Sequence, residues 1–344
     1  MGYTTKLLDD VRAKIAPADE TLRAARSRRD EVLAALKEFP GRLRDYSSGS
    51  IGHRTANDDT DADCGVVLDR RTYPELGPDG DGEGPDGVME EIRTHVRERL
   101  RATHPAVSTR LSKRAIVVKF NEPLTSGDNA PDPSVDLIVA LTRKEADGLW
   151  IPNRDPGRWD PSHPEMHTQL LTDPPDDLRR LRSRTVRLVK AQNKQYSLPA
   201  LSSFNIEALA LECITELHSL GEAVTTWFEY AAKELKHANT KDPAGVSGPI
   251  KLLLDRDTIV QRLEKAATHM RAAMDHDDDE ERVTEELALV FWKYVEKSAS
   301  DSSKAAFATA LRGGNSNFNR AGVFAATTPR PLKTVSSYGD GEIR

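Results

Sequence analysis

The sequence lacks the features that define several classes of protein. Among its 344 residues there are two cysteines, Cys64 and Cys213, which alone build neither a disulfide framework nor a zinc site. No apolar stretch approaches the roughly 20 residues that a membrane-spanning helix needs. Residues 1–14 also lack the apolar run of a signal peptide. We therefore expect a cytoplasmic protein that contacts no membrane, with both cysteines as buried apolar side chains.

A general excess of positive charge is absent as well. The net charge is −6, which argues against an extended nucleic-acid surface, so any anionic ligand must meet a local basic patch. Apolar residues make up 38% and charged residues 30% of the chain, enough for a core beneath a heavily solvated surface. The length favours one two-lobed unit or two intimate domains.

The first half of the chain mixes helix and strand patterns. Apolar residues recur at helical spacing over 4–38, where Pro17 predicts a break, and again over 88–103. The glycine-rich segment 77–87 reads as a flexible insertion. Short β-branched apolar runs predict three strands, the last two as antiparallel neighbours: 64–69, 115–120 and 135–141.

From about Pro174 onward the strand patterns disappear and helices dominate. The acidic run 275–281 is expected to be a solvated connector, and the tail after residue 313 to be irregular. The helices expected in this half cover 176–195, 203–220, 222–237, 256–274 and 280–298.

Three aspartates form the first pattern that indicates chemistry. Asp61 and Asp63 flank Ala62, and on a strand such alternate residues face the same side. Asp136 begins another predicted strand and could bring a third carboxylate to the pair. Neighbouring carboxylates repel one another unless cations lie between them, and Mg²⁺ prefers such oxygen ligands together with phosphates. The pattern predicts a two-metal site in which Asp61, Asp63 and Asp136 are both catalytic and metal-binding.

A phosphate loop is predicted ten residues before this pair. Gly49 allows backbone amides to approach a phosphate closely, and the Ser50 hydroxyl can add a hydrogen bond to it. Alone, a Gly-Ser pair means little. Before a strand that carries Asp61 and Asp63, it indicates the binding of a nucleoside triphosphate.

The combined pattern resembles the polymerase-β-like nucleotidyltransferases, and within them the bacterial CD-NTases, the cGAS-like enzymes that make cyclic nucleotide signals. The stretch 49–55 (GSIGHRT) resembles the phosphate loop of that group, with Thr55 as a downstream nucleotide contact. The stretch 159–167 (WDPSHPEMH) looks like the link between the lobes of that group. The stretch 202–207 (SSFNIE) is similar to a motif in which a serine, here Ser203, touches the triphosphate and an aromatic residue, here Phe204, stacks on a base.

The resemblance implies an α+β fold, with a mixed-sheet nucleotidyltransferase core and an all-helical second lobe across a cleft. The expected domains are 1–170, the core with its N-terminal helices, 171–312, the helical nucleotide-binding lid, and 313–344, the tail. Trp159, His163 and His167 are interpreted as a structural link rather than a metal site.

A basic helix in the second lobe supports nucleotide binding independently. Between residues 178 and 206 there are seven cations and no acid. Helical geometry at 100° per residue puts the cations Arg180, Arg187, Lys190 and Lys194 on one face. The apolar residues Leu178, Leu181, Leu188 and Val189 fall on another, core-facing one. Lys190 is the first candidate for a phosphate ligand by similarity to the family, and Lys194 is the second. An ordinary solvated basic helix is the competing interpretation.

The expected activity is Mg²⁺-dependent joining of NTPs, with two ions and Mn²⁺ as a substitute. The resemblance alone implies that the product is a cyclic di- or oligonucleotide second messenger, which acts on an effector in anti-phage defence. We expect a monomer that binds NTP substrates, ATP among them, and whose partner is a regulatory protein or an effector that acts through the product. Two alternatives remain. One is RNA tailing or linear oligonucleotide synthesis on the same scaffold, and the other is an inactive nucleotide- or partner-binding module.

Overall fold

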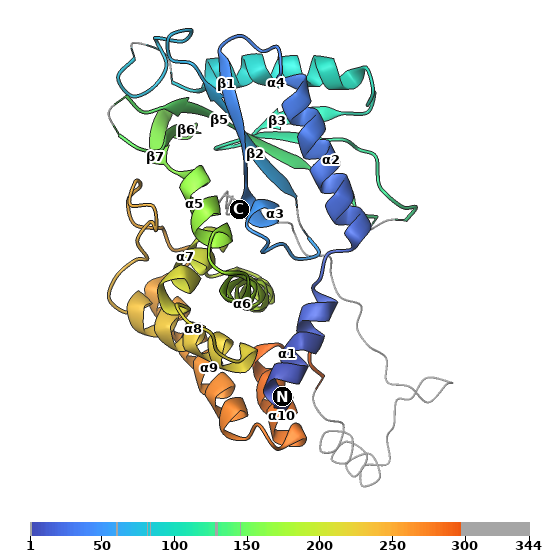
Figure 1. Cartoon of the computed structure of the whole chain (residues 1–344), viewed down its shortest axis with the longest axis vertical. Helices are drawn as coiled ribbons and strands as arrows, with labels where there is room; N and C mark the ends of the chain where they lie inside the picture. The colour runs from blue at the N-terminus through green and yellow to red at the C-terminus, as the bar shows by residue number, and fades with distance from the viewer. Residues whose placement is uncertain are drawn as a thin grey trace, which may run out of the picture.

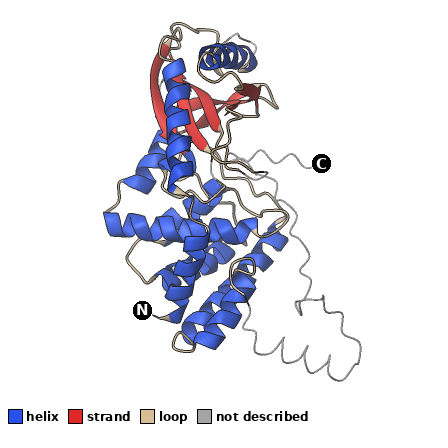
Figure 2. Cartoon of the chain, turned by 90° about the vertical axis from the view of Figure 1, so that its right-hand side faces the viewer, coloured by secondary structure: helices blue, strands red, loops and turns tan. Residues whose placement is uncertain are grey.

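The computed structural model describes residues 2–59, 61–80, 82, 84–127, 130–144 and 146–296, which form two lobes along the long axis of the molecule (Figure 1). One lobe is a sheet with helices packed on it, and the other consists of helices (Figure 2). The predicted α+β class, with a mixed sheet and a helical second lobe, is confirmed. The tail predicted to be irregular lies outside the described residues.

The sheet has seven strands in the described part of the chain. The order of its main strands is β1-β2-β5-β4-β3. Off this path, β6 pairs with β5 and with β7. β2 and β5 are parallel, whereas the other pairs are antiparallel, including the predicted β4–β5 pair. The strands are β1 Arg42–Ser48, β2 Ala62–Leu68, β3 Ser108–Leu111, β4 Ile116–Lys119, β5 Val135–Thr142, β6 Leu149–Asn153 and β7 Arg158–Ser162.

Helices pack against one face of the sheet and make up the second lobe. They are α1 Tyr3–Lys14, α2 Asp19–Ala35, α3 Gly49–Gly52, α4 Asp86–Arg101, α5 Pro164–Thr172, α6 Asp176–Lys194, α7 Ser203–Cys213, α8 Leu220–Leu235, α9 Arg256–Asp275 and α10 Glu280–Val290. None of the helices in the described ranges combines the length and the apolar character needed to cross a bilayer.

The two faces of the sheet have different roles because side chains alternate along each strand. One face, with Cys64 and Val66 of β2, packs against α2 and α4 in a single apolar cluster. The opposite face carries the smaller cluster that includes Val67 and Ile138. Asp63 and Asp136 precede these two residues by even spacings, so they lie on the face that α2 and α4 leave uncovered.

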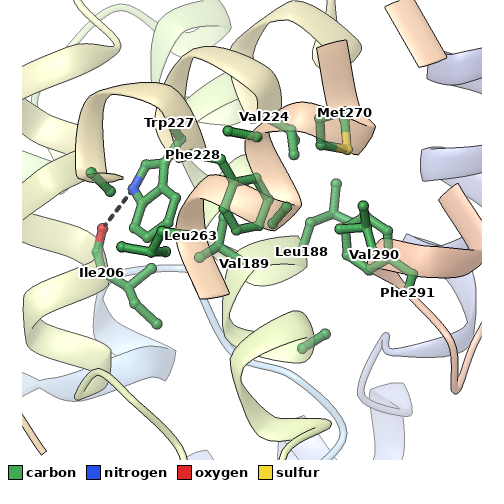
Figure 3. Close-up of a cluster of buried hydrophobic side chains, with 14 of the residues drawn as sticks. Leu188, Val189, Ile206, Val224, Trp227, Phe228, Leu263, Met270, Val290 and Phe291 are labelled. Carbon is green, nitrogen blue, oxygen red and sulfur yellow. Dashed lines mark hydrogen bonds between the residues drawn. The ribbon is translucent and has the colours of Figure 1, made fainter. Parts of the chain in front are cut away.

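The helical lobe has its own apolar core. Trp227 and Phe228 of α8 lie at its centre and are fully buried (Figure 3). The indole Nε1 of Trp227 donates a hydrogen bond to the backbone oxygen of Ile206 at 3.2 Å, which satisfies the one polar atom of this side chain. Leu8 and Val11 of α1 belong to the same core, so a helix of the expected 1–170 domain packs in the second lobe.

Several elements differ from the sequence prediction. The predicted helix 203–220 is wrong, because α7 ends at Cys213 and α8 begins after Ser219, whose side chain accepts a hydrogen bond from the N–H of Glu222. The predicted helix 280–298 ends at Val290, where Phe291 leaves helical geometry and is buried. Cys64 is buried as predicted, whereas Cys213 is half-buried.

The acidic run 275–281 connects α9 to α10 as predicted, and it also caps two helices. The N–H of Thr4 donates to Oδ1 of Asp277 at 2.7 Å, which satisfies a free donor at the start of α1. Asp279 accepts hydrogen bonds at the start of α10. This connector therefore joins the first helix of the chain to the last pair of helices in the lobe.

Candidate active site

Two of the predicted aspartates are brought together by strand register. Asp63 on β2 and Asp136 on β5 are paired positions in the parallel ladder. Both are buried, with 2% and 7% of their surface exposed. Neither oxygen of Asp63 has a hydrogen-bond partner among the described residues. A buried carboxylate without partners is costly, so this position is suited to a ligand that carries positive charge.

Asp61 lies two residues before Asp63, just ahead of β2, and is therefore on the same face of the strand. Its Oδ1 accepts the N–H of Ser134 at 2.8 Å, a hydrogen bond to the segment that leads into β5. Ala62 and Cys64 between and after the pair are fully buried on the opposite face, as the alternation predicts.

Burial and neighbouring carboxylates raise the pKa of Asp63. Burial raises the pKa of Asp63 well above its usual value, and the charges of Asp136 and Asp61 add to that effect. Burial also raises the pKa of Asp61, although the hydrogen bond from Ser134 opposes the shift. A neighbouring positive charge would therefore favour the ionised form of Asp63.

The predicted phosphate loop lies directly against Asp63. Ser48, the last residue of β1, is paired with Asp63 in the antiparallel ladder, and Gly49 follows with φ of +67°. A Cβ atom at Gly49 would lie 1.8 Å from Oδ2 of Asp63, so only glycine fits here. Ser50 is the second residue of the short helix α3. The backbone at Gly49 and Ser50 thus forms one wall of the carboxylate site.

The aspartates could supply some, but not all, of the ligands of a divalent cation. Mg²⁺ in phosphate-transfer sites is held by one or two carboxylates and completes its shell with phosphate oxygens and water. The unpartnered oxygens of Asp63, next to Asp136, match that arrangement. Within the described ranges no group of three or more histidine, cysteine, aspartate or glutamate side chains encloses a metal position by itself. Any ion here would depend on ligands from the substrate.

The predicted phosphate-binding lysines already have partners in the protein. Nζ of Lys190 donates to Oε1 of Glu207 at 2.6 Å and to Oγ1 of Thr55 at 3.0 Å, and all three residues are buried. Thr55 in turn donates to Glu207 at 2.6 Å. Lys194 pairs with Asp59 at the surface. Lys190, Thr55 and Glu207 therefore form a buried polar cluster beside the site. The predicted row of cations with free charges is not present at Lys190 and Lys194, because each is paired with a carboxylate.

Ser203 and Phe204 open α7, as the sequence motif predicts. The helix is capped by Ser202, whose hydroxyl accepts the N–H of Asn205 at 3.2 Å. The Phe204 ring is half-buried and lies 4.6 Å from the ring of His167. His167 is in turn held by Asp242, with Nε2 and Oδ1 2.7 Å apart.

The other residues of the predicted link have structural contacts. Trp159 of β7 is buried in the core of the sheet lobe. His163 caps α5, because its Nδ1 accepts the N–H of Met166 at 3.2 Å. α5 contacts β1 of the sheet lobe and α6 of the helical lobe, so it lies at the junction of the lobes (Figure 1).

Sequence reasoning missed two members of the polar cluster, His53 and Glu207. Both fall inside the motifs at 49–55 and 202–207, but the resemblance assigns no role to either residue. Glu207 is the first acidic residue after the cationic stretch 178–206. That position is the one signal that could have identified it as a partner for a buried lysine.

No protein-family model matches the sequence, and no curated protein matches it. Solved structures do match. CdnC of Escherichia coli MS115-1, solved in a complex with a HORMA protein, is 16% identical with a TM-score of 0.62, over 86% of this chain and 98% of that one.

Two further matches have ligands in the same kind of fold. The CD-NTase CdnG of Bradyrhizobium diazoefficiens, solved with GTP, is 14% identical with a TM-score of 0.63, over 83% of this chain and 95% of that one. The cyclic AMP-GMP synthase DncV of Vibrio cholerae, solved with a linear intermediate, is 14% identical with a TM-score of 0.54, over 86% and 87%. The chain therefore has the fold of the bacterial cGAS-like CD-NTases, a polymerase-β-like nucleotidyltransferase fold.

Proposed function

We propose that this protein is a Mg²⁺-dependent nucleotidyltransferase that joins NTPs into a cyclic di- or oligonucleotide. The observation that carries the proposal is the buried pair Asp63–Asp136 on neighbouring parallel strands. The carboxylate oxygens of Asp63 have no hydrogen-bond partner among the described residues, and this carboxylate lies against the backbone of Gly49. A carboxylate pair beneath a glycine loop is suited to a metal-bound triphosphate.

The chemistry requires an acceptor hydroxyl to attack the α-phosphate of a donor NTP in line, with pyrophosphate as the leaving group. Mg²⁺, with Mn²⁺ as a substitute, would supply charge neutralisation and lower the pKa of that hydroxyl when held by Asp61, Asp63 and Asp136. The Gly49–Ser50 backbone would contact the phosphates, because Gly49 has no side chain and its backbone lies against Asp63. Ser203 and Phe204 at the start of α7 would hold the phosphates and base of the nucleotide.

The nucleotide class follows from the structural neighbours. CdnG was solved with GTP, and DncV with a linear intermediate 5′-pppA(3′,5′)pG. The shared fold makes NTPs the proposed substrates here, with a linear dinucleotide as the intermediate before ring closure. We also propose that the cyclic product activates a separate effector in anti-phage defence, and that a regulatory protein controls the enzyme, since CdnC was solved with a HORMA partner.

The test is product analysis. The protein is incubated with Mg²⁺ and all four NTPs, each labelled in turn, and the products are treated with phosphatase. A cyclic product resists the phosphatase, whereas a linear oligonucleotide or RNA tail loses its terminal phosphates. Asp63→Asn should abolish product formation. Consumption of no NTP by the wild type, with or without Mn²⁺, would favour an inactive binding module.

The defence role has a separate test. Bacteria that carry the gene together with the adjacent genes are infected with phage, and plaque numbers are compared between the wild type and Asp63→Asn. Equal plaque numbers together with an active enzyme would leave the nucleotide chemistry standing and overturn the defence role.

A further inference from the structure

A buried polar cluster joins the phosphate loop to the helical lobe. It consists of His53 and Thr55 after α3, Lys190 on α6 and Glu207 on α7. The carboxylate of Glu207 is at its centre: Oε1 accepts from Lys190 and Thr55, both at 2.6 Å, and Oε2 lies 2.9 Å from Nδ1 of His53. Lys190 and Glu207 are each 4% exposed. One carboxylate thus contacts two lobes through three side chains.

Two residues of the cluster, His53 and Thr55, are also bonded through their main chain to the backbone of the predicted phosphate loop. The N–H of His53 donates to the carbonyl of Gly49 at 2.9 Å, and the N–H of Thr55 donates to the carbonyl of Ser50 at 2.8 Å. Any movement of His53 and Thr55 is therefore transmitted to Ser50 and to Gly49, which lies against Asp63. On its other side, the His53 ring contacts Thr168 of α5 at 3.1 Å.

Charge balance explains why the cluster can be buried. Lys190 and Glu207 neutralise one another, and the geometry leaves Lys190 one N–H donor beyond those given to Glu207 and Thr55. Burial alone would raise the pKa of Glu207, but Lys190 and His53 outweigh burial and lower it. The carboxylate is therefore ionised and available to all of its partners.

We propose that Glu207 is a positioning residue, which holds Lys190 and the segment 53–55 so that the Gly49–Ser50 backbone is set against Asp63 and the helical lobe. In this role Lys190 is chiefly part of the support, with Glu207 as its permanent partner. The effect on turnover rests on the proposed nucleotidyltransferase function, whereas the effect on the loop can be measured without it.

The first measurement is amide hydrogen exchange in the full chain. Glu207→Gln keeps the size of the side chain but removes the charge and one of the acceptor oxygens. We expect exchange at the amides of His53 and Thr55 to rise by about tenfold or more, because their hydrogen bonds to the loop open more often. The matched control is Glu286→Gln, which removes a similar carboxylate–histidine contact to His269 between α9 and α10. It should leave exchange in segment 47–59 unchanged.

The second measurement is turnover of labelled NTPs. Glu207→Gln should lower kcat by roughly 10- to 100-fold, the scale expected when reacting groups are misplaced by about an ångström. Glu207→Asp keeps the charge but is one methylene shorter, so it cannot reach Lys190, Thr55 and His53 together. It should lose activity as Glu207→Gln does. Thr55→Val added to Glu207→Gln should cost little more, because both act through one cluster.

Three outcomes would overturn the proposal: unchanged exchange over 47–59 in Glu207→Gln, wild-type turnover in Glu207→Asp, or additive losses for Thr55→Val and Glu207→Gln. If Glu207→Gln does not fold, Thr55→Val alone should still raise exchange at His53 and Thr55. If the wild type consumes no NTP, the proposed function fails, and the exchange measurement still decides whether Glu207 holds the loop.

Discussion

Asp63 and Asp136 are paired in register on parallel strands and buried side by side, and the carboxylate of Asp63 has no hydrogen-bond partner among the described residues. An aspartate whose pKa is raised by folding destabilises the folded state at neutral pH. Asp63 therefore lowers the stability of the fold at the position where a cation and a triphosphate are proposed to bind.

Replacing Asp63 should therefore separate stability from function. At pH 8 in EDTA, we expect Asp63→Asn to be more stable than the wild type, with a free energy of unfolding about 1–3 kcal/mol higher, because the buried charge is removed. Added Mg²⁺ should stabilise the wild type and not the variant. Urea unfolding with EDTA and with Mg²⁺ measures both effects.

The control is Asp69→Asn, at the other end of β2, where the carboxylate is paired with Arg71. It should keep the Mg²⁺-dependent gain and show no increase in stability in EDTA. A wild type that gains no stability from Mg²⁺, or an Asp63→Asn protein less stable than the wild type in EDTA, would contradict the assignment.

Two glycines of the phosphate loop should respond differently to the same substitution. Gly49→Ala introduces a Cβ 1.8 Å from Asp63 and a side chain at φ of +67°, so NTP turnover should fall at least 100-fold. Gly52→Ala lies in the same short helix, where the nearest atom is 3.7 Å from the new Cβ, so it should be close to the wild type. Steady-state kinetics and thermal unfolding compare the two, and equal behaviour would show that Gly49 does not define the site.

Strands that are buried on both faces were predictable from the sequence. β2 and β5 are continuous apolar runs after their aspartates, which indicates strands covered on both sides. β1 was missed because each of its first four residues, Arg42 to Asp45, is polar or exposed, in a strand that pairs on one side only. Pairing with β2 decides that structure, and pairing is not visible in a local pattern.

The basic helix shows the same limit for the site. Helical spacing correctly placed Leu181, Leu188 and Val189 of α6 towards the core. It did not show that Lys190 would be buried beside Glu207, since that partner comes from α7 and depends on how two helices cross. Spacing along one element predicts a face, whereas the neighbour of that face is a property of the tertiary structure.

Arg28 should be more important for stability than its position on a polar helix suggests. Its guanidinium on α2 donates to Asp132, to the backbone oxygen of Pro133 and to that of Glu122, and it holds the loop that leads into β5. Arg28→Ala should lower the free energy of unfolding by roughly 2–4 kcal/mol, because these acceptors lose a buried charged donor. Arg26→Ala, at an exposed position of the same helix, should change it by less than about 0.5 kcal/mol. Urea unfolding distinguishes these outcomes, and similar losses would refute the anchoring role.

The same loop should also make stability depend on pH through His104. Its two ring nitrogens contact Glu122 at 2.8 Å and Glu31 at 2.6 Å. Burial alone would lower the His104 pKa, but both carboxylates outweigh burial and raise it above the usual 6.5. A histidine with a raised folded pKa stabilises the fold fully below about pH 6.5 and loses that contribution as the pH rises through the folded pKa.

His104→Gln should therefore lower the melting temperature more at pH 6 than at pH 9. His237→Gln, an exposed histidine after α8, serves as the control and should show no such difference. A deficit for His104→Gln that is equal at both pH values would mean that the ring acts by packing alone.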